Sequence, residues 1–562
     1  MNRRDFLKTA AAGGTVLVGA SSSEALGSLL PFPLRRRAAP TDSTIEVLVN
    51  EPIGVVAPEI YGHFVEHLGG VVYDGIWVGE KSKVANVGGI RASLLEALRK
   101  IKPSVIRWPG GCFADSYNWR DGIGPRAGRP RRPNFWVNDA SWPAGCPDGP
   151  WKYDTNEFGT DDFVRFCRLV GGAPYLAANV RSLTARDFDE WVDYCNAPPG
   201  TTTLGDMRAA AGAREPHGVR FWGVGNESWG CGGNFTPEDY ASEYRRFVEW
   251  VPRFGQPLSF IPSGPNGGDV EWTRRFFTNM NERGGLGRVW GWALHHYSWN
   301  VSGGRTTDWR AGKGSAVGYP EDEWFELLAE AARVETLVVD HWAAMGQQDR
   351  QRRVRLVVDE WGAWYKPGSE VDPTHLFGQQ STIRDAVLAA QTLDTFNRHA
   401  DKVAMANVAQ LVNCLHALFL AHEDRFVVTP TYHVFDLYQV HQGAKALRMV
   451  VLAPAVSHTY GTRTVTLAGL SGSASMRDRQ VVVTVTNPDP KEPRDAAVTV
   501  RGAAIARATA VVLSAASIQD VNSFDAPERI RPLDAKAGTP RDGRLTHTFP
   551  PASVTRLQLE LA

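Results

Sequence analysis

The sequence predicts an α/β fold, a (β/α)8 barrel of the TIM type, followed by an all-β domain, and three observations support it. Between about residues 58 and 413, short β-rich apolar runs alternate with longer segments whose apolar residues recur every three to four positions, as in successive βα units. Eight such runs favour a closed barrel over an open sheet, and no G-x-G-x-x-G follows the first. Beyond about Thr431, short alternating strands separated by Gly, Pro and Asp clusters indicate a β-sandwich.

Each barrel strand is predicted from an extended apolar run, and each outer helix from a segment with helical periodicity. The predicted strands are Glu59–Phe64, Val105–Pro109, Tyr175–Val180, Phe221–Glu227, Leu258–Gly264, Trp290–Tyr297, Arg355–Glu360 and Val403–Leu411. The predicted helices are Ile90–Ile101, Asp161–Val170, Pro237–Trp250, Asp322–Met345 and Gln379–Ala400.

Four parts of the chain follow from these patterns. Residues 1–42 are an export signal and linker, 43–57 hold a strand expected to join the C-terminal domain, 58–430 form the catalytic barrel, and 431–562 form a jelly-roll-like β-sandwich. The early strand is predicted over Thr44–Asn50. The sandwich strands are predicted over Val481–Thr486, Ala497–Arg501, Thr509–Leu513 and Val554–Leu559.

The N-terminus is typical of a twin-arginine export signal. Arg3 and Arg4 precede a modest apolar run, Thr9–Ala20, that is too short to span a bilayer stably. We therefore expect export by the twin-arginine route to the periplasm or the cell exterior, with no membrane attachment after removal of the signal.

Composition limits the partners. The 61 basic and 61 acidic residues balance, so neither nucleic acid nor an anionic membrane is expected as a partner, and a neutral substrate fits better. The 19 tryptophans fit either core packing or sugar binding, and composition alone does not choose between them.

The six cysteines are scattered, with no C-x-x-C pair, so we predict no structural zinc, no other metal and no cofactor. An oxidising destination allows one disulfide. Cys146 and Cys231 are the first pair to test, because both lie in Gly/Pro-rich loops.

The candidate chemistry lies at strand ends, because the active site of such a barrel forms at the carboxyl ends of its strands. The fourth predicted strand ends at Glu227 and the seventh at Glu360. Two glutamates facing each other across the barrel mouth are what a retaining glycosidase requires, with one protonating the leaving oxygen and the other attacking the anomeric carbon. Taken singly, either glutamate could equally form a salt bridge at the rim.

The motif around Glu227 resembles a known family. Trp222–Trp229 is similar to the Asn-Glu acid/base motif of the barrel glycosidase clan, and Gly223–Asn234 looks like the α-L-arabinofuranosidases of glycoside hydrolase family 51. The resemblance covers nearly all of residues 58–445. Further similar segments are Tyr61–His67, Arg107–Gly111, Tyr117–Trp119, Thr155–Gly159, Val358–Gly362, Met405–Asn413 and Thr429–His433.

The resemblance implies roles for the two glutamates and their neighbours. Glu227 would be the general acid/base and Glu360 the nucleophile that forms a covalent arabinosyl-enzyme. Asn226 would bind a sugar hydroxyl, Tyr297 would hydrogen-bond the nucleophile, and Arg107 would help to keep it ionised. For Arg107, a structural ion pair away from the sugar is the alternative.

Other residues would shape the sugar pocket. Glu66 and Gln410 look like the polar residues that hold the furanose. Of His295 and His296, which point to opposite faces of a strand, one would line the pocket, and we place His295 there. Cys112 stands where many family members have a sugar-contacting asparagine, so it is either a poorer ligand or a small packing residue.

Three rival interpretations remain. His63–His67 matches H-x-x-E-H, an inverted zinc-protease motif, but glycines on both sides make the required helix improbable. The same glutamate pair could serve an endo-acting β-glucanase or xylanase. A non-catalytic carbohydrate-binding protein is the third alternative.

The resemblance thus implies a retaining, exo-acting α-L-arabinofuranosidase. It would remove terminal non-reducing residues from arabinoxylan, arabinan or derived oligosaccharides. The resemblance also implies a homo-oligomer.

Overall fold

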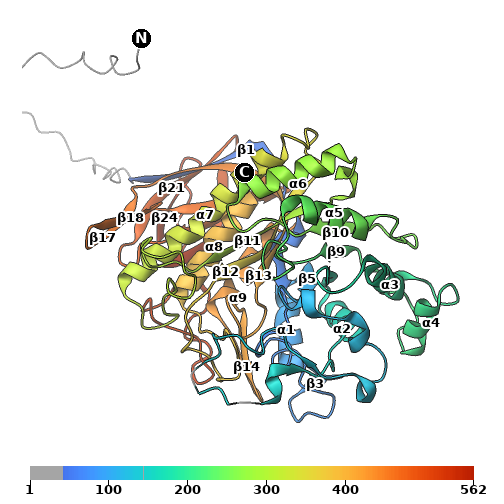
Figure 1. Ribbon diagram of the computed structural model, residues 1–562. Coiled ribbons are helices and arrows are strands. Elements are labelled where there is room, and N and C mark those ends of the chain that lie inside the picture. Colours follow the sequence, from blue (N-terminus) through green and yellow to red (C-terminus); the bar gives the residue numbers. More distant parts are fainter. Residues whose placement is uncertain (1–41, 144, 148) are drawn as a thin grey trace, which may run out of the picture. The chain divides into compact units, whose positions relative to one another are not determined.

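The computed structural model describes residues 42–562, apart from residues 144 and 148 (Figure 1). The predicted export signal therefore lies outside the described residues. Within the described part of the chain, no helix is long and apolar enough to cross a membrane.

The predicted barrel is present as an eight-stranded sheet in which every neighbouring pair is parallel. Its order is β10-β9-β8-β5-β2-β13-β12-β11. The strands are β2 (Gly62–Phe64), β5 (Val105–Trp108), β8 (Ala173–Ala178), β9 (Phe221–Val224), β10 (Ser259–Pro262), β11 (Gly291–Ser298), β12 (Arg355–Ala363) and β13 (Val403–Ala409). The two end strands also approach each other, because Trp290 N–H donates to the Phe260 carbonyl at 2.9 Å. The predicted fold class is confirmed.

Each observed barrel strand overlaps a predicted one, but the ends differ. The largest difference is at the first strand, where Pro58–Tyr61 forms a 3-10 turn and β2 begins only at Gly62. Pro58 lacks a backbone N–H and fixes φ, so it favours the start of a helical turn over a strand.

Side chains from successive strands fill the inside of the barrel. One buried cluster contains Val105, Tyr175, Phe221, Ile261, Ala293, Val357 and Met405, one residue from each of seven strands. The eighth strand has Gly62, where a Cβ would come within 2.2 Å of Asn407 Oδ1. The barrel is therefore a packed core, and its site must lie at a mouth.

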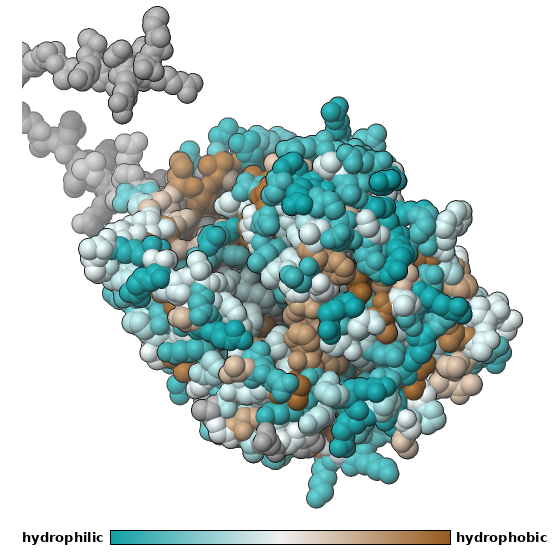
Figure 2. Space-filling view, in the orientation of Figure 1, coloured by the Kyte–Doolittle hydropathy of each residue, from teal (hydrophilic) through white to brown (hydrophobic). Residues whose placement is uncertain are grey.

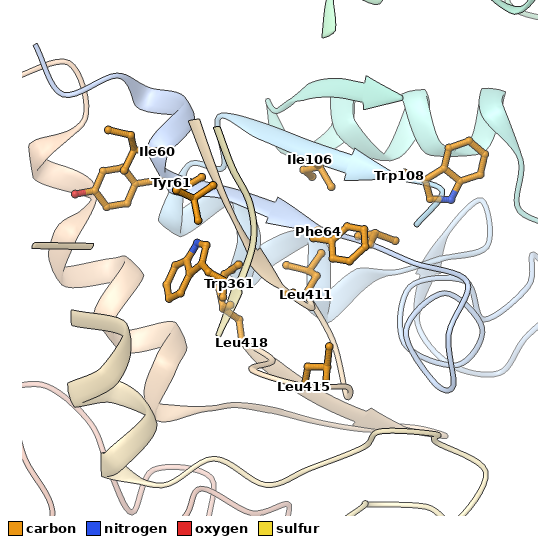
Figure 3. Close-up of a cluster of buried hydrophobic side chains, with 14 of the residues drawn as sticks. Ile60, Tyr61, Phe64, Ile106, Trp108, Trp361, Leu411, Leu415 and Leu418 are labelled. Atoms are coloured by element: carbon orange, nitrogen blue, oxygen red, sulfur yellow. The ribbon is translucent and has the colours of Figure 1, made fainter. Parts of the chain in front are cut away.

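A second cluster packs around β2 and its neighbours (Figure 3). Tyr61, Ile106, Trp108 and Trp361 are each at most 1% exposed and come from segments far apart in the sequence. Burial of such large side chains holds the strands that carry the functional residues.

The helices lie outside the barrel. They are α1 (Ala92–Ile101), α2 (Thr160–Val170), α3 (Ala185–Asn196), α4 (Thr203–Ala210), α5 (Pro237–Val248), α6 (Val270–Glu282), α7 (Glu321–Met345), α8 (Ile383–Arg398) and α9 (Pro430–Tyr438). The predicted helices correspond to α1, α2, α5, α7 and α8. Helix α9 lies where the sandwich was expected to begin, because Pro430 suits a first helical position and starts one more turn of barrel-side helix.

The C-terminal all-β domain is a nine-stranded sheet of order β23-β22-β25-β20-β19-β16-β1-β21-β24. Its strands are β1 (Ser43–Val55), β16 (Lys445–Leu452), β19 (Ser471–Arg477), β20 (Gln480–Asn487), β21 (Arg494–Arg501), β22 (Ile505–Leu513), β23 (Leu533–Ala535), β24 (Arg544–Phe549) and β25 (Ser553–Leu561). Strand β1 pairs antiparallel with β16 and parallel with β21, so it precedes the barrel in sequence but belongs to this sheet. The strands bury a common core that includes Ile45, Val483 and Leu557.

Four two-stranded antiparallel sheets lie outside these two large sheets in the described part of the chain. They are β3–β4 (Asn86–Val87, Ile90–Arg91), β6–β7 (Arg132–Pro133, Tyr153–Asp154), β14–β15 (Phe419–His422, Arg425–Val428) and β17–β18 (Val456–Tyr460, Arg463–Leu467).

Helix α8 joins the barrel to the all-β domain. Its buried Asp394 accepts hydrogen bonds from the hydroxyls of Ser473 and Thr484, both at 2.6 Å, and from Tyr438 at 2.9 Å. Burial raises the pKa of Asp394 to about 6, although these hydrogen bonds oppose the shift. The surface seen in Figure 2 is largely hydrophilic, with a hollow near its centre.

Candidate active site

Glu227 follows the end of β9 on a tightly turned backbone. Gly225 has φ of 79° and Glu227 itself has φ of 39°, so the chain turns sharply after the strand. The turn is held by buried Asp115, which accepts the N–H of Asn226 at 2.9 Å and that of Val180 at 2.7 Å. Burial raises the pKa of Asp115 to about 7 against the effect of these bonds.

Glu360 lies on β12 and is almost fully enclosed. Its Oε1 accepts from Arg107 Nη1 at 2.8 Å, and its Oε2 accepts from the Tyr297 hydroxyl at 2.7 Å. Burial alone would raise the pKa of Glu360, but His295, Arg107 and the Tyr297 hydrogen bond together hold it below its usual value. Glu360 is therefore suited to remain an ionised nucleophile.

Glu227 is more open to solvent, with a side chain 22% exposed against 7% for Glu360. His295 lies between them, its Nδ1 being 3.0 Å from Glu227 Oε1 and 3.6 Å from Glu360 Oε2. Burial alone would lower the pKa of His295, but the two carboxylates raise it. One oxygen of each carboxylate and the histidine nitrogen all lie within 4.8 Å of one another.

That separation matches double displacement. Carboxyl groups about 5 to 5.5 Å apart serve retaining glycosidases, whereas inverting enzymes need about 6.5 to 9.5 Å to admit a water. The pair thus has one enclosed, ionised member and one more exposed member.

Arg107 connects the two sides of the site from β5. Besides Glu360, its Nη2 donates to Asn226 Oδ1 at 2.7 Å, and its Nε lies 3.4 Å from Asp359 Oδ2. Although burial opposes it, the neighbouring carboxylates raise the pKa of Arg107. Asp359 also accepts from Tyr175 at 2.8 Å. Sequence reasoning missed Asp359, which lies within β12 beside Glu360, and Asp115, which lies in a 3-10 turn beyond β5.

Glu66 and Gln410 form a reciprocal pair between the segments that follow β2 and β13. Gln410 Nε2 donates to Glu66 Oε2 at 3.0 Å, and Glu66 N–H donates to Gln410 Oε1 at 2.9 Å. Burial, followed by the charge of Glu360, raises the pKa of Glu66 to about 7. The pair lies near enough to the nucleophile for the charge of Glu360 to act on Glu66.

Gly110 and Gly111 allow these side chains to approach the chain. A Cβ at residue 111 would lie 2.8 Å from Glu360 Oε1, and one at residue 110 would lie 2.6 Å from Glu66 Cγ. A side chain at either position would displace a carboxylate of the site.

The disulfide prediction was wrong. Cys231 pairs with Cys112, and Cys146 is free. The loops after β5 and β9 bring Cys112 and Cys231 together at the barrel mouth, and loop composition alone could not reveal this. Cys112 therefore has no thiol to offer a sugar, and the two sulfurs lie 4.0 and 3.8 Å from Glu227 Oε2.

Removing this disulfide is expected to destabilise the protein. It closes a separation of 119 residues, and a native disulfide of that kind contributes about 2 to 4 kcal/mol. The Cys112→Ser/Cys231→Ser variant should show this loss in chemical denaturation without reductant. Cys146→Ser is the control and should unfold like the wild type. A loss in the control instead would contradict the assigned pairing.

The histidines of the H-x-x-E-H segment are used for packing and hydrogen bonding. His63 is buried in β2 against Phe435, and burial lowers its pKa to about 3. His67 lies 2.5 Å from Asp154 and accepts from Trp108 at 2.9 Å. The two histidines do not converge on a site, which argues against the zinc-protease interpretation. His296 likewise points away from the pocket, toward the Glu330 carbonyl at 2.9 Å.

Replacing Tyr297 by phenylalanine should raise the pKa of Glu360, because the carboxylate loses a hydrogen bond. The acid limb of the kcat/KM profile should then move to higher pH, and kcat/KM should fall roughly 10- to 100-fold. Tyr438→Phe is a matched control, since Tyr438 is a buried tyrosine that donates to a carboxylate in α8. Equal pH profiles for the two variants would contradict this prediction.

Comparison with known proteins agrees with this geometry. The family models for the α-L-arabinofuranosidase 1 domain and the α-L-arabinofuranosidase C-terminal domain match residues 97–267 and 359–553. An intracellular exo-α-L-arabinofuranosidase of Bacteroides ovatus is 33% identical over 93% of this chain and 96% of its own. An intracellular exo-α-(1→5)-L-arabinofuranosidase of Bifidobacterium longum is 26% identical over 89% of each chain. The crystal structure of the GH51 arabinofuranosidase from Xanthomonas axonopodis pv. citri superposes with a TM-score of 0.84, at 33% identity over 92% of this chain and 100% of that one.

The same comparison contradicts the predicted export. The Bacteroides and Bifidobacterium relatives are both named intracellular enzymes. The prediction of a periplasmic or extracellular protein is therefore wrong. It rested on Arg3, Arg4 and a short apolar run, and so brief a pattern is not constrained by packing in a folded core.

Proposed function

Because the chain belongs to the α-L-arabinofuranosidases of glycoside hydrolase family 51, we propose that it is an exo-acting enzyme that hydrolyses terminal α-L-arabinofuranosyl linkages with retention. The observation that carries the mechanism is the close approach of the Glu227 and Glu360 carboxylates, within 4.8 Å, in unequal surroundings. The substrates that we propose are arabinoxylan, arabinan and oligosaccharides derived from them.

In the first step, Glu360 attacks the anomeric carbon while Glu227 protonates the departing glycosidic oxygen. The hydrogen bonds from Arg107 and Tyr297 orient the two oxygens of Glu360 and keep the carboxylate ionised. His295 hydrogen-bonds Glu227 at 3.0 Å, so it orients the acid. The product of this step is a covalent arabinosyl-enzyme.

In the second step, Glu227, now ionised, takes a proton from water that attacks the same carbon, and Glu360 departs. The greater exposure of Glu227 supports this role, because water must reach it. Glu66, Gln410 and Asn226 would hold the furanose hydroxyls, and the Cys112–Cys231 disulfide would form the wall beside the acid/base.

Proton NMR of the first product formed tests the stereochemistry. We expect the α-anomer of arabinose to appear before mutarotation. Initial appearance of the β-anomer would refute double displacement.

A side-by-side release assay tests the substrate. We expect arabinose from synthetic arabinofuranosides, arabinoxylan and arabinan, and no new reducing ends from β-glucan or unbranched xylan. Cleavage of the latter two would favour an endo-acting enzyme, and sugar binding without turnover would favour a binding protein. A homo-oligomer remains a prediction, which light scattering of the purified protein tests.

A further inference from the structure

A second cluster of ligand-type side chains lies apart from the two glutamates. Three groupings of His, Cys, Asp and Glu among the described residues have atoms within 4.8 Å of one another. Two of them contain Glu227 and belong to the site above, one of them through sulfurs that are joined in a disulfide. The third consists of Asp74, His375 and His422.

These three residues come from three different loops. Asp74 lies in the loop after β2, His375 in the loop between β12 and α8, and His422 at the end of β14. Each loop continues from a segment that carries Glu66, Glu360 or Gln410 of the candidate active site. A bond among the three loops would therefore fix the segments behind the sugar pocket.

The distances are compatible with a shared cation as well as with hydrogen bonds, since the 3.2 Å contact of His422 Nδ1 with Asp74 Oδ2 is itself within hydrogen-bond reach. Asp74 Oδ2 lies 3.2 Å from His422 Nδ1 and 3.4 Å from His375 Nε2. Hydrogen bonds to a carboxylate from a charged donor are usually about 2.7 to 2.9 Å long. Ligand atoms about 2.0 to 2.1 Å from a tetrahedral zinc ion stand about 3.3 Å apart, which is close to both observed separations.

Surrounding groups hold Asp74 and His422 in place, as is usual in metal sites, whereas the far nitrogen of His375, Nδ1, is buried without a hydrogen-bond partner in the described part of the chain. The other oxygen of Asp74 accepts from Glu423 N–H at 3.0 Å and from Arg91 at 3.2 Å. The far nitrogen of His422 lies 3.5 Å from Asp372. These contacts leave Asp74 Oδ2 and the near nitrogens of the two histidines directed at one another.

The ring of His375 is positioned by Gly70. His375 is 3% exposed, and a Cβ at residue 70 would lie 2.5 Å from His375 Nε2. The side chains of His422 and Asp74 are 21% and 29% exposed, which leaves an approach from solvent. The cluster is thus anchored on one side and accessible on the other.

We propose that Asp74, His375 and His422 bind one Zn²⁺ ion that cross-links these three loops. Two imidazoles and a carboxylate are a ligand set that zinc favours, with water in the fourth position. The cysteine spacing that argues against structural zinc has no bearing on this site, because its ligands are distant in sequence and contain no sulfur. The role assigned to the ion is to cross-link the loops, since the cluster is separate from the paired glutamates.

The test measures zinc binding, and activity is not the readout. Full-length protein with its disulfide intact is stripped with chelator, dialysed, and titrated with ZnCl₂ by calorimetry while Tm is recorded. We expect one Zn²⁺ per chain and a rise in Tm. His422→Ala should bind zinc roughly 100-fold or more weakly and lose the rise in Tm.

His458→Ala is the matched control. Its side chain is 21% exposed, like that of His422, and it also faces two carboxylates, Glu321 and Asp322. This variant should bind zinc as the wild type does. Asp74→Asn provides a second loss-of-ligand variant of nearly the same shape, and a cooperative unfolding transition of each variant in chelator shows that it is folded.

Two results would overturn the proposal. The first is that the wild-type protein takes up no zinc. The second is that His422→Ala or Asp74→Asn binds zinc as tightly as the wild type does. The Glu360→Gln variant should retain its zinc, because Glu360 is not among the three proposed ligands. Loss of zinc in that variant would place the ion at the catalytic glutamates and refute the proposed site.

Discussion

Glu360→Gln is expected to lower kcat by roughly 10⁴-fold or more on every arabinofuranoside, because an amide cannot attack the anomeric carbon. Glutamine keeps the volume of the side chain and can still meet Arg107 and Tyr297 in part. The loss should therefore appear in kcat with little change in Tm. Steady-state kinetics with an aryl arabinofuranoside and thermal unfolding measure the two quantities.

Glu326→Gln provides a closely matched control. Glu326 is 2% exposed in α7 and is held by an arginine and a tyrosine, Arg463 and Tyr460, just as Glu360 is. It lies against the β17–β18 hairpin, away from the paired glutamates. The Glu326→Gln replacement should lower Tm and leave kcat near that of the wild type. A similar loss of kcat in both variants would mean that Glu360 acts only through the stability of the fold.

Glu227→Ala is expected to separate substrates by their leaving groups. On arabinan or arabinoxylan oligosaccharides, whose leaving alcohols need a proton, kcat/KM should fall by about 10² to 10⁴-fold. Aryl arabinofuranosides with acidic phenol leaving groups need little protonation, so their first step should be much less affected. The measurement is kcat/KM over a series of phenols of increasing acidity.

The same variant tests which glutamate has which role. In Glu227→Ala, kcat/KM should depend steeply on the acidity of the phenol leaving group. In Glu360→Gln, activity should be lost on all substrates alike. If Glu227→Ala lost kcat/KM equally on natural and aryl substrates, the assignment of Glu227 as the acid would be contradicted. His295 hydrogen-bonds Glu227 in the wild type. In Glu227→Ala, we expect that His295 does not replace the lost proton donor on natural substrates.

Much of the barrel was predictable because its signals are local. Strand Phe221–Val224 and the Leu356–Val358 part of β12 are apolar runs bounded by glycine or charge, and burial of such runs requires no knowledge of distant residues. The strand-end rule then placed Glu227 and Glu360 at one mouth of the barrel. Helix α9 was missed because its nine residues are apolar with little periodicity and begin with a proline that also suits a loop.

The supporting residues were harder to predict because they act through partners far away in sequence. In the sequence, Asp115 looks like any other acidic residue. Its role depends on the hydrogen bonds that it accepts from the N–H groups of Val180 and Asn226 in the folded chain. Asp359 does not stand out in the sequence, because Glu360 beside it is the better candidate for chemistry. Its contact with Arg107 becomes visible only when β5 and β12 face each other across the barrel.

The sequence by itself determined the barrel, the all-β domain, the family and the glutamate pair, because periodicity, strand ends and motif strings are properties of short segments. Only the tertiary structure decided that Cys231 pairs with Cys112, that Glu360 rather than Glu227 is enclosed by Arg107 and Tyr297, and that Asp74 meets two histidines. Each of these depends on how strands and loops that are distant in the sequence meet at the barrel mouth. Such distances are set by packing of the whole chain, and no local pattern of residues records them.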